Sequence, residues 1–107
     1  MRRGTTPTIN LIFQNSEGSP VDLTSFTVYL TIDDGKGHKT DFTNDRITFN
    51  EDLSMDITLT QEETLTFKGT TLYAQVRAVD SEGLAIASDV VSTALEDILK
   101  DGVIWAD

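Results

Sequence analysis

The 107-residue chain contains no cysteine, which excludes disulfides, thiolate metal sites and cysteine nucleophiles. Its apolar runs are short, as at residues 11–13 and 84–86, so the sequence predicts neither a transmembrane helix nor the apolar segment of a secretory signal. A chain of this length holds one hydrophobic core and can fold without a metal or a crosslink. We therefore expect a single domain over residues 1–107 with no membrane partner.

Basic residues are scarce. Eight lysines and arginines stand against eighteen aspartates and glutamates, which gives a net charge of −10. Such a field repels nucleic acid unless basic residues gather in a patch. The nearest approach to a patch is Arg2-Arg3 and the spaced pair Lys36 and Lys39, and neither pair forms a stripe. We expect a solvated acidic surface and no nucleic-acid partner.

Residues typical of catalysis are also few. His38 is the only histidine, and its glycine- and lysine-rich surroundings predict an exposed hairpin loop. Adjacent carboxylates occur in several pairs, but neighbouring residues of a strand point to opposite faces, so these pairs do not converge by themselves. Gly35 and Gly37 are not followed by the residues of a phosphate-binding loop. We expect no enzyme activity, no cofactor and no small-molecule substrate.

Four aspartates lie around two predicted turns, and oxygen-rich loops suit hard cations such as calcium. These aspartates are Asp33, Asp34, Asp41 and Asp45. An EF-hand loop has glycine at its sixth position, whereas the sixth position counted from Asp33 is His38. The sequence therefore predicts a solvated charged loop and no metal site, with calcium binding as the alternative.

Period-two alternation dominates the chain, and its sixteen threonines, with valine and isoleucine, favour strands. Clusters of glycine, asparagine, aspartate and serine separate the alternating stretches. We expect strands at residues 8–13, 27–32, 38–42, 46–49, 53–59, 71–79 and 84–93. About seven strands without βαβ alternation predict an all-β fold, an antiparallel immunoglobulin-like sandwich, with a partly open barrel as the alternative.

One face of these strands carries the expected core. Its members are Ile9, Leu11, Phe13, Val28, Leu30, Ile32, Leu53, Met55, Ile57, Leu59, Leu72, Ala74, Val76 and Ala78. Between two strands, residues 60–65 predict one short helical turn, in which Thr60 caps the helix and Glu63 completes a capping box. We expect Gly69 to end this turn.

The two ends of the chain are the candidate docking segments. Residues 1–5 predict a flexible N-terminal arm, and residues 94–107 an apolar C-terminal tail. The tail has two interpretations: a short helix, ended by Gly102, that folds back over a sheet edge, or a segment at 103–105 that stays exposed and inserts into a neighbour. The candidate partner-docking residues are Arg2, Arg3, Leu95, Ile98, Leu99, Val103, Ile104 and Trp105.

Three stretches give the sequence a more specific character: MRRGTTPT at residues 1–8, LTQEETLTF at residues 59–67, and the Ala87-Ser88-Asp89 step before the apolar tail. In these the chain resembles small proteins encoded in the tail-module regions of phages and prophages of Gram-positive bacteria. The resemblance spans nearly the whole chain. The layout is also similar to the amino-terminal domain of phage baseplate upper proteins, which is an immunoglobulin-like sandwich.

The resemblance implies a non-enzymatic virion structural or assembly protein, a tail or baseplate component that docks to other virion subunits or to further copies of itself. It also implies a location in the virion and, during assembly, in the host cytoplasm. The alternative function is a host-surface carbohydrate-binding module, which requires exposed aromatic side chains on one sheet face. Tyr29 and Tyr73 occupy the outward positions that would supply them.

Overall fold

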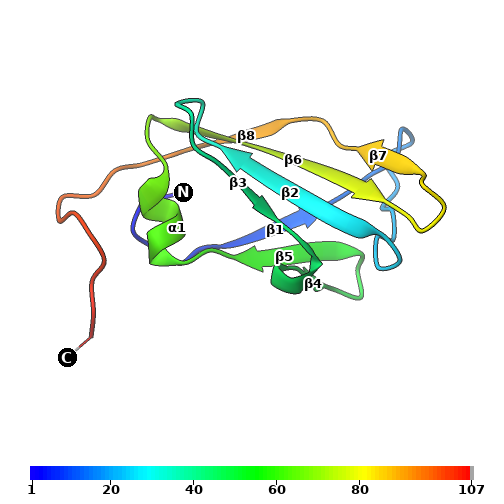
Figure 1. The fold of residues 1–107 in the computed structure, drawn as a ribbon, viewed down its shortest axis with the longest axis horizontal. Coiled ribbons are helices and arrows are strands. Elements are labelled where there is room, and N and C mark those ends of the chain that lie inside the picture. The colour runs from blue at the N-terminus through cyan, green and yellow to red at the C-terminus, as the bar shows by residue number, and fades with distance from the viewer. Residues whose placement is uncertain (107) are drawn as a thin grey trace.

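Two antiparallel β-sheets face each other, and one short helix lies at one end of the layers (Figure 1). The computed structural model describes residues 1–106. The all-β sandwich expected from the alternating sequence is confirmed. The elements in chain order are β1 (Thr8–Ile12), β2 (Thr27–Asp33), β3 (Lys39–Phe42), the 3-10 helix η1 (Asn44–Arg46), β4 (Thr48–Phe49), β5 (Ser54–Thr58), α1 (Gln61–Thr66), β6 (Thr71–Val79), β7 (Ala85–Ala87) and β8 (Val91–Ala94).

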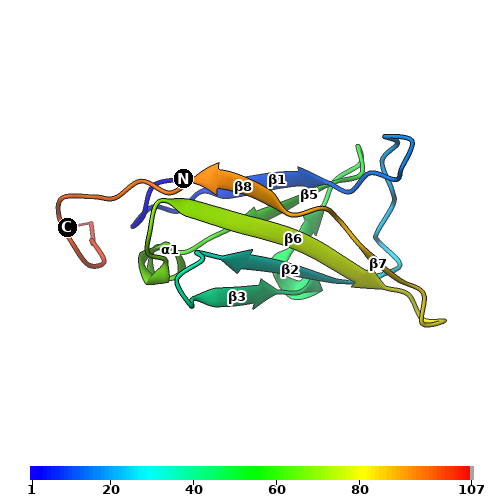
Figure 2. The same cartoon turned by 90° about the horizontal axis from the view of Figure 1, so that it is seen from above.

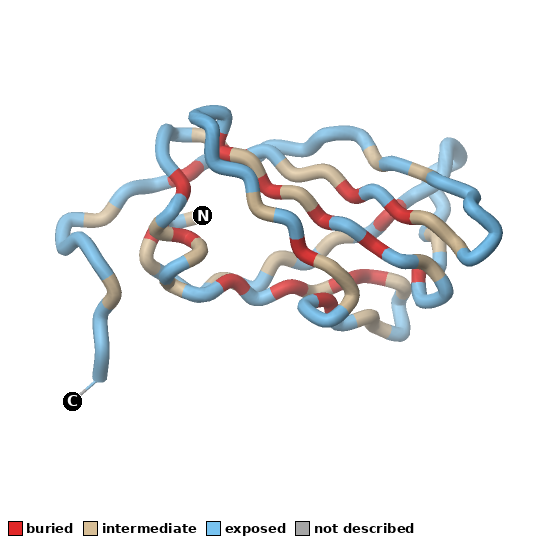
Figure 3. Tube along the Cα trace, viewed as in Figure 1, coloured by how far each residue is buried: buried red, intermediate tan, exposed pale blue. Residues whose placement is uncertain are grey.

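The first sheet has the strand order β1-β5-β4, and the second has β3-β2-β6, with β7 and β8 both paired to the other side of β6. Ile9 stands opposite Ile57 in the first sheet, and Leu30 stands opposite Val76 in the second. Because side chains alternate between the two faces of a strand, this register turns the apolar set of each sheet toward the other sheet. Figure 3 shows the buried positions recurring along the strands of both layers.

Most of the expected core residues are buried between the sheets, while Ile9, Leu11 and Ala74 are only partly buried. The core also contains apolar residues that the alternating pattern did not predict to be buried. They are Leu23, Phe42, Ile47, Phe67 and Leu95.

Leu53 was expected in the core, and this prediction is wrong. Leu53 has a left-handed backbone with φ of 68° and belongs to the turn before β5, where its N–H donates to the carbonyl of Asn50 at 3.1 Å. The next residue, Ser54, is buried instead, and its hydroxyl donates to the carboxylate of Asp52. The turn thus takes a residue that the alternating pattern assigns to the strand.

The expected strand at residues 84–93 is interrupted and forms β7 and β8. On β6 the paired positions Ala74 and Arg77 are three residues apart, whereas their partners Val91 and Ala87 are four apart. One extra residue on one strand is the signature of a β-bulge. Ser88 stabilises the interruption, because its hydroxyl accepts a bond from the N–H of Val76 at 3.0 Å while its own N–H donates to the Val76 carbonyl.

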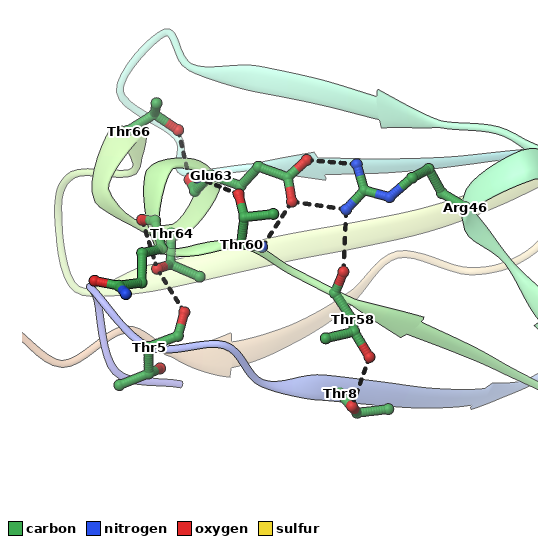
Figure 4. Close-up of polar contacts among 9 residues, drawn as sticks. Thr5, Thr8, Arg46, Thr58, Thr60, Glu63, Thr64 and Thr66 are labelled. Atoms are coloured by element: carbon green, nitrogen blue, oxygen red, sulfur yellow. Dashed lines mark hydrogen bonds and ion pairs between the residues drawn. The ribbon is translucent and has the colours of Figure 1, made fainter. Parts of the chain in front are cut away.

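Helix α1 begins as the sequence predicts, and the capping box is confirmed. The N–H of Glu63 donates to the Thr60 hydroxyl at 3.2 Å, and the Glu63 carboxylate accepts from the N–H of Thr60 at 2.8 Å. Arg46 of η1 also donates two hydrogen bonds, each of 2.8 Å, to the Glu63 carboxylate (Figure 4). These bonds lower the pKa of Glu63 and tie α1 to η1. The helix ends at Thr66, before the expected stop at Gly69.

Candidate functional site

Residues 1–5 and residues 94–98 meet beside α1, and we call this region, with α1, the terminal junction. Arg2 and Glu96 form a parallel β-bridge, and their side chains form an ion pair. The N–H of Arg3 donates to the Glu96 carbonyl at 2.9 Å, and the N–H of Glu96 donates to the carbonyl of Met1 at 2.8 Å. Figure 2 shows the N-terminus beside the end of β8. The expectation of a flexible arm at residues 1–5 is therefore corrected.

Arg3 is the centre of the terminal junction and is only 8% exposed. Its guanidinium donates to two carbonyls at the C-terminal end of α1, those of Phe67 at 2.9 Å and Leu65 at 3.0 Å. A third bond of 2.5 Å reaches the carboxylate of Asp97. Cations bind well at the C-terminal end of a helix, where carbonyl groups lack helical partners. Arg3 thus belongs to the protein's own packing and is not a free docking residue.

Thr64 joins the N-terminal segment to the other side of α1. Its side chain is fully buried and accepts a bond from the N–H of Gly4 at 2.9 Å. Its hydroxyl donates to the carbonyl of Thr5 at 3.0 Å (Figure 4). Gly4 has φ of 72°, and a Cβ placed on it would lie 2.8 Å from the Cδ1 atom of Ile98. Glycine at this position lets the C-terminal segment pass close to the N-terminal one.

The C-terminal tail divides into two parts at this junction. Leu95 is 5% exposed and belongs to the core, and Ile98 is partly buried next to Gly4. The predicted short helix over residues 95–99 does not form. Its backbone is extended because Glu96 pairs with residues 1–3. Leu95 and Ile98 thus pack on the protein's own body and are removed from the docking candidates, whereas Ala94, Glu96 and Asp97 are exposed.

Residues 99–106, which we call the outer tail, leave the sandwich. Leu99 is fully exposed, Ile104 is more than half exposed and Trp105 is 82% exposed. Val103 is partly buried and lies with Trp105 along a shallow hollow formed by residues 58–62 and Thr6. The side-chain amide of Gln61 holds the segment by accepting from the N–H of Ile104 at 3.0 Å and donating to its carbonyl at 3.1 Å.

A second surface feature is an apolar groove that lies between β1, at the edge of one sheet, and β8, at the edge of the other. We call it the β1–β8 groove. Its volume is about 330 Å³, and a smaller hollow continues it past Leu11 and Ile12 toward Ser88. The described residues that line the main groove carry no charged side chain: Met1, Pro7, Thr8, Ile9, Leu11, Ile32, Leu72, Ala74, Val91, Ser92 and Thr93. Alternation alone assigned Ile9, Leu11 and Ala74 to a closed core and so missed the groove.

The only histidine of the chain contacts a buried aspartate, and we call the contacts of Asp34 with residues 36, 38 and 68 the clasp. His38 lies in the β2–β3 loop with its Nδ1 atom 2.6 Å from the carboxylate of Asp34, which is fully buried. That carboxylate also accepts from the backbone N–H groups of Lys36 at 2.7 Å, His38 at 3.1 Å and Lys68 at 2.7 Å. Burial alone would raise the pKa of Asp34, but the bonds from Lys68, Lys36 and His38 outweigh it and hold the pKa far below its usual value. The clasp fixes the loop to the segment after α1.

The remaining aspartates of the calcium alternative do not converge. Asp33 accepts from the N–H of Gly35, Asp41 from the hydroxyl of Thr31, and Asp45 from the hydroxyl of Thr43. Within residues 1–106, no group of three or more histidine, aspartate or glutamate side chains is arranged to hold a metal ion. In the same residues, no helix has both the length and the apolar character to span a bilayer.

The exposed surfaces of the fold carry the argument for function. Comparisons of the chain with protein-family models, with curated proteins and with solved structures found no match. Two features of the described residues are apolar and accessible: the outer tail and the β1–β8 groove. Accessible apolar surface of this kind commonly marks a site of protein–protein contact.

Proposed function

We propose that the protein is a non-enzymatic structural or assembly subunit of a phage or prophage virion, a tail or baseplate component that docks to other virion subunits. The observation that carries the proposal is the exposure of the outer tail, where the side chains of Leu99, Ile104 and Trp105 are largely accessible although Gln61 holds the backbone of Ile104. Tryptophan is among the residues most enriched as an interface anchor. The resemblance of the chain to phage tail-module proteins agrees with this role.

The outer tail is held weakly enough to be moved by a partner. Gln61 holds it through two hydrogen bonds to the backbone of one residue, Ile104. Each such bond contributes about 0.5–1.5 kcal/mol net, so a partner that buries Trp105 gains more than the exchange costs. The outer tail is therefore available for docking without disruption of the terminal junction.

Deleting residues 99–107 is expected to leave the protein folded and to abolish its incorporation into virions. The core residue Leu95 and the partners of Arg2 and Arg3 stay in the shortened chain, so its thermal unfolding midpoint should change little. Incorporation is measured by immunoblotting purified particles from a producing host whose own copy is replaced by the variant.

A longer deletion, of residues 94–107, is the matched control. It removes Leu95, Glu96 and Asp97, so it should lower thermal stability strongly, because Arg3 loses its ion pair and the core loses an apolar side chain. Particles that contain the 99–107 deletion at the level of the full chain would refute docking through the outer tail.

Carbohydrate binding is the second candidate, and it is favoured by a polar hollow of about 320 Å³ beside Tyr73. Thr31, Asp33, Lys39 and Gln75 also line it, which places hydrogen-bonding groups next to one aromatic ring. The expected pair of tyrosines does not form one platform. Tyr29 is opposite Arg77 and Tyr73 is opposite Asp33, four positions along the register, or about 13 Å.

For a carbohydrate-binding role, Tyr73→Ala is expected to remove binding to host cell-wall glycans, because the ring is the apolar wall of the hollow. Tyr29→Ala is the matched control, since Tyr29 is equally exposed on the same sheet but lies outside the hollow. Binding is measured by pull-down on purified cell walls. Absence of binding by the unaltered protein, or equal binding by both variants, would rule this function out.

A further inference from the structure

We propose that the β1–β8 groove receives the outer tail of a second copy of this chain, which adds to the sandwich as an extended strand. The proposal rests on the proposed function and names the surface and the partner for one of its contacts. Four observations support it: the character of the sheet edges, the shape of the groove, the lack of charged side chains in both the groove and residues 102–106, and the position of the outer tail.

The sheet edges differ in how they are protected against strand pairing. The edge strand β3 carries the charged residues Lys39 and Asp41, and the edge strand β4 is only two residues long. Both features discourage pairing with another chain. The edge strands that border the groove, β1 and β8, contain no charged residue and no proline. The neutral edges therefore lie together on the side of the sandwich where the groove opens.

The groove has the shape that an added strand requires. Ile9, Leu11 and Ala74 point toward the core yet stay partly exposed, because no strand covers them on this side within residues 1–106. An extended segment that pairs with β1 would place alternate side chains over these residues. The main volume of about 330 Å³ is enough for one large aromatic side chain. Trp105 is the only tryptophan in the chain.

Charge favours the outer tail as the occupant. Two copies with a net charge of −10 repel each other, so a contact between them forms most readily where neither surface is charged. Residues 102–106 are uncharged, and the lining of the groove has no charged side chain; the charged group there is the N-terminal ammonium of Met1, which donates to the carbonyl of Ala94 at 2.7 Å. Val103 and Trp105 are two residues apart, so in an extended strand both face the groove.

The position of the outer tail favours contact with another copy. Figures 1 and 2 show that it leaves the sandwich at the α1 end and runs away from β1 and β8. A tail on one copy and a groove on the next form a heterologous contact, which repeats from copy to copy into a ring or a filament. A short strand buries less than the roughly 1,200–2,000 Å² of a stable dimer, so a single contact is weak and is best trapped covalently.

The absence of cysteine in the chain allows a clean cross-linking experiment. One full-length chain carries Ala106→Cys, which keeps Trp105, and a second carries Val91→Cys or Thr93→Cys, at two places along the groove. The matched control carries Thr27→Cys, at an exposed position on the paired strand β2. Equal amounts of two chains are mixed and oxidised, and the mixed dimer is quantified by mass spectrometry.

We expect the mixed dimer to form with Val91→Cys or Thr93→Cys and at background level with Thr27→Cys. Adding Trp105→Ala to the Ala106→Cys chain should reduce the mixed dimer about tenfold, the effect of losing an aromatic anchor. Equal yields at all three positions would overturn the proposal. So would an internal disulfide in a chain that carries both Val91→Cys and Ala106→Cys, because the tail would then occupy its own groove.

The same variants separate this inference from the proposed function. If the mixed dimer does not form but deletion of residues 99–107 still abolishes incorporation into virions, the outer tail docks to a different subunit and only the self-contact is wrong. If the mixed dimer forms while the deleted chain is incorporated normally, self-association stands and the proposed docking role fails.

Discussion

Replacing Asp34 with alanine is expected to lower the free energy of unfolding by about 3 to 5 kcal/mol, because a buried carboxylate and all of its bonds are lost together. The variant leaves the backbone N–H groups of Lys36, His38 and Lys68 without their acceptor. These groups lie in two separate segments, the β2–β3 loop and the stretch after α1, so the loss affects both. Chemical denaturation followed by circular dichroism measures the change.

The neighbouring variant Asp33→Ala is the matched control for this prediction. Asp33 is only partly buried, and its carboxylate accepts from the N–H of Gly35 at 2.9 Å. The same substitution one residue away should therefore cost far less than at Asp34. Equal costs at the two positions would show that the clasp does not stabilise the fold.

The contribution of Asp34 also has a defined pH dependence. Its carboxyl has a lower pKa in the folded than in the unfolded chain, so the folded state binds fewer protons in this range. The stabilisation is therefore complete above the unfolded pKa of about 3.9 and is lost as the pH falls below that value toward the folded pKa. The difference in stability between the unaltered protein and Asp34→Ala should accordingly be constant near pH 7 and shrink in acid.

Ile57→Ala is expected to cost about 2 to 5 kcal/mol, the usual effect of truncating a buried isoleucine. Ile57 is 2% exposed on β5, opposite Ile9. Ile12→Ala is the matched control, since it makes the same chemical change on the neighbouring strand β1 at a side chain that is 45% exposed. Urea unfolding of both variants provides the comparison, and an unchanged midpoint for Ile57→Ala would contradict the core packing.

Local patterns predicted the strands and the start of α1 well, because alternation and capping depend on residues close in sequence. The bounds of β6 agree with the alternation of residues 71–79, and the capping box of Thr60 and Glu63 forms as expected. The pattern failed where a turn or a bulge overrides it, at Leu53 and at Ser88. In both places the backbone follows hydrogen bonds that no hydrophobic period encodes.

The candidate site was predicted only in part, since its contacts join distant parts of the chain. Leu99, Ile104 and Trp105 are exposed, whereas Val103, which the docking interpretation of the tail also places in the exposed segment, is partly buried. The burial of Arg3 and Leu95 disagrees with that interpretation. Arg3 is buried by partners that lie more than sixty residues away in the sequence. One signal for the groove was present in the sequence: the lack of charge in both β1 and β8, which distinguishes them from β3.

The terminal junction has a consequence for how the protein is made. Arg2 and Arg3 are synthesised before their partners Glu96 and Asp97, which follow 94 residues later. At about 5–20 residues per second, this delay lasts roughly 5 to 20 s. The carbonyls of Leu65 and Phe67 follow Arg3 by 62 and 64 residues, so they can accept its guanidinium before the ion pairs that close the junction form. The native junction is therefore completed only after Glu96 and Asp97 have been synthesised.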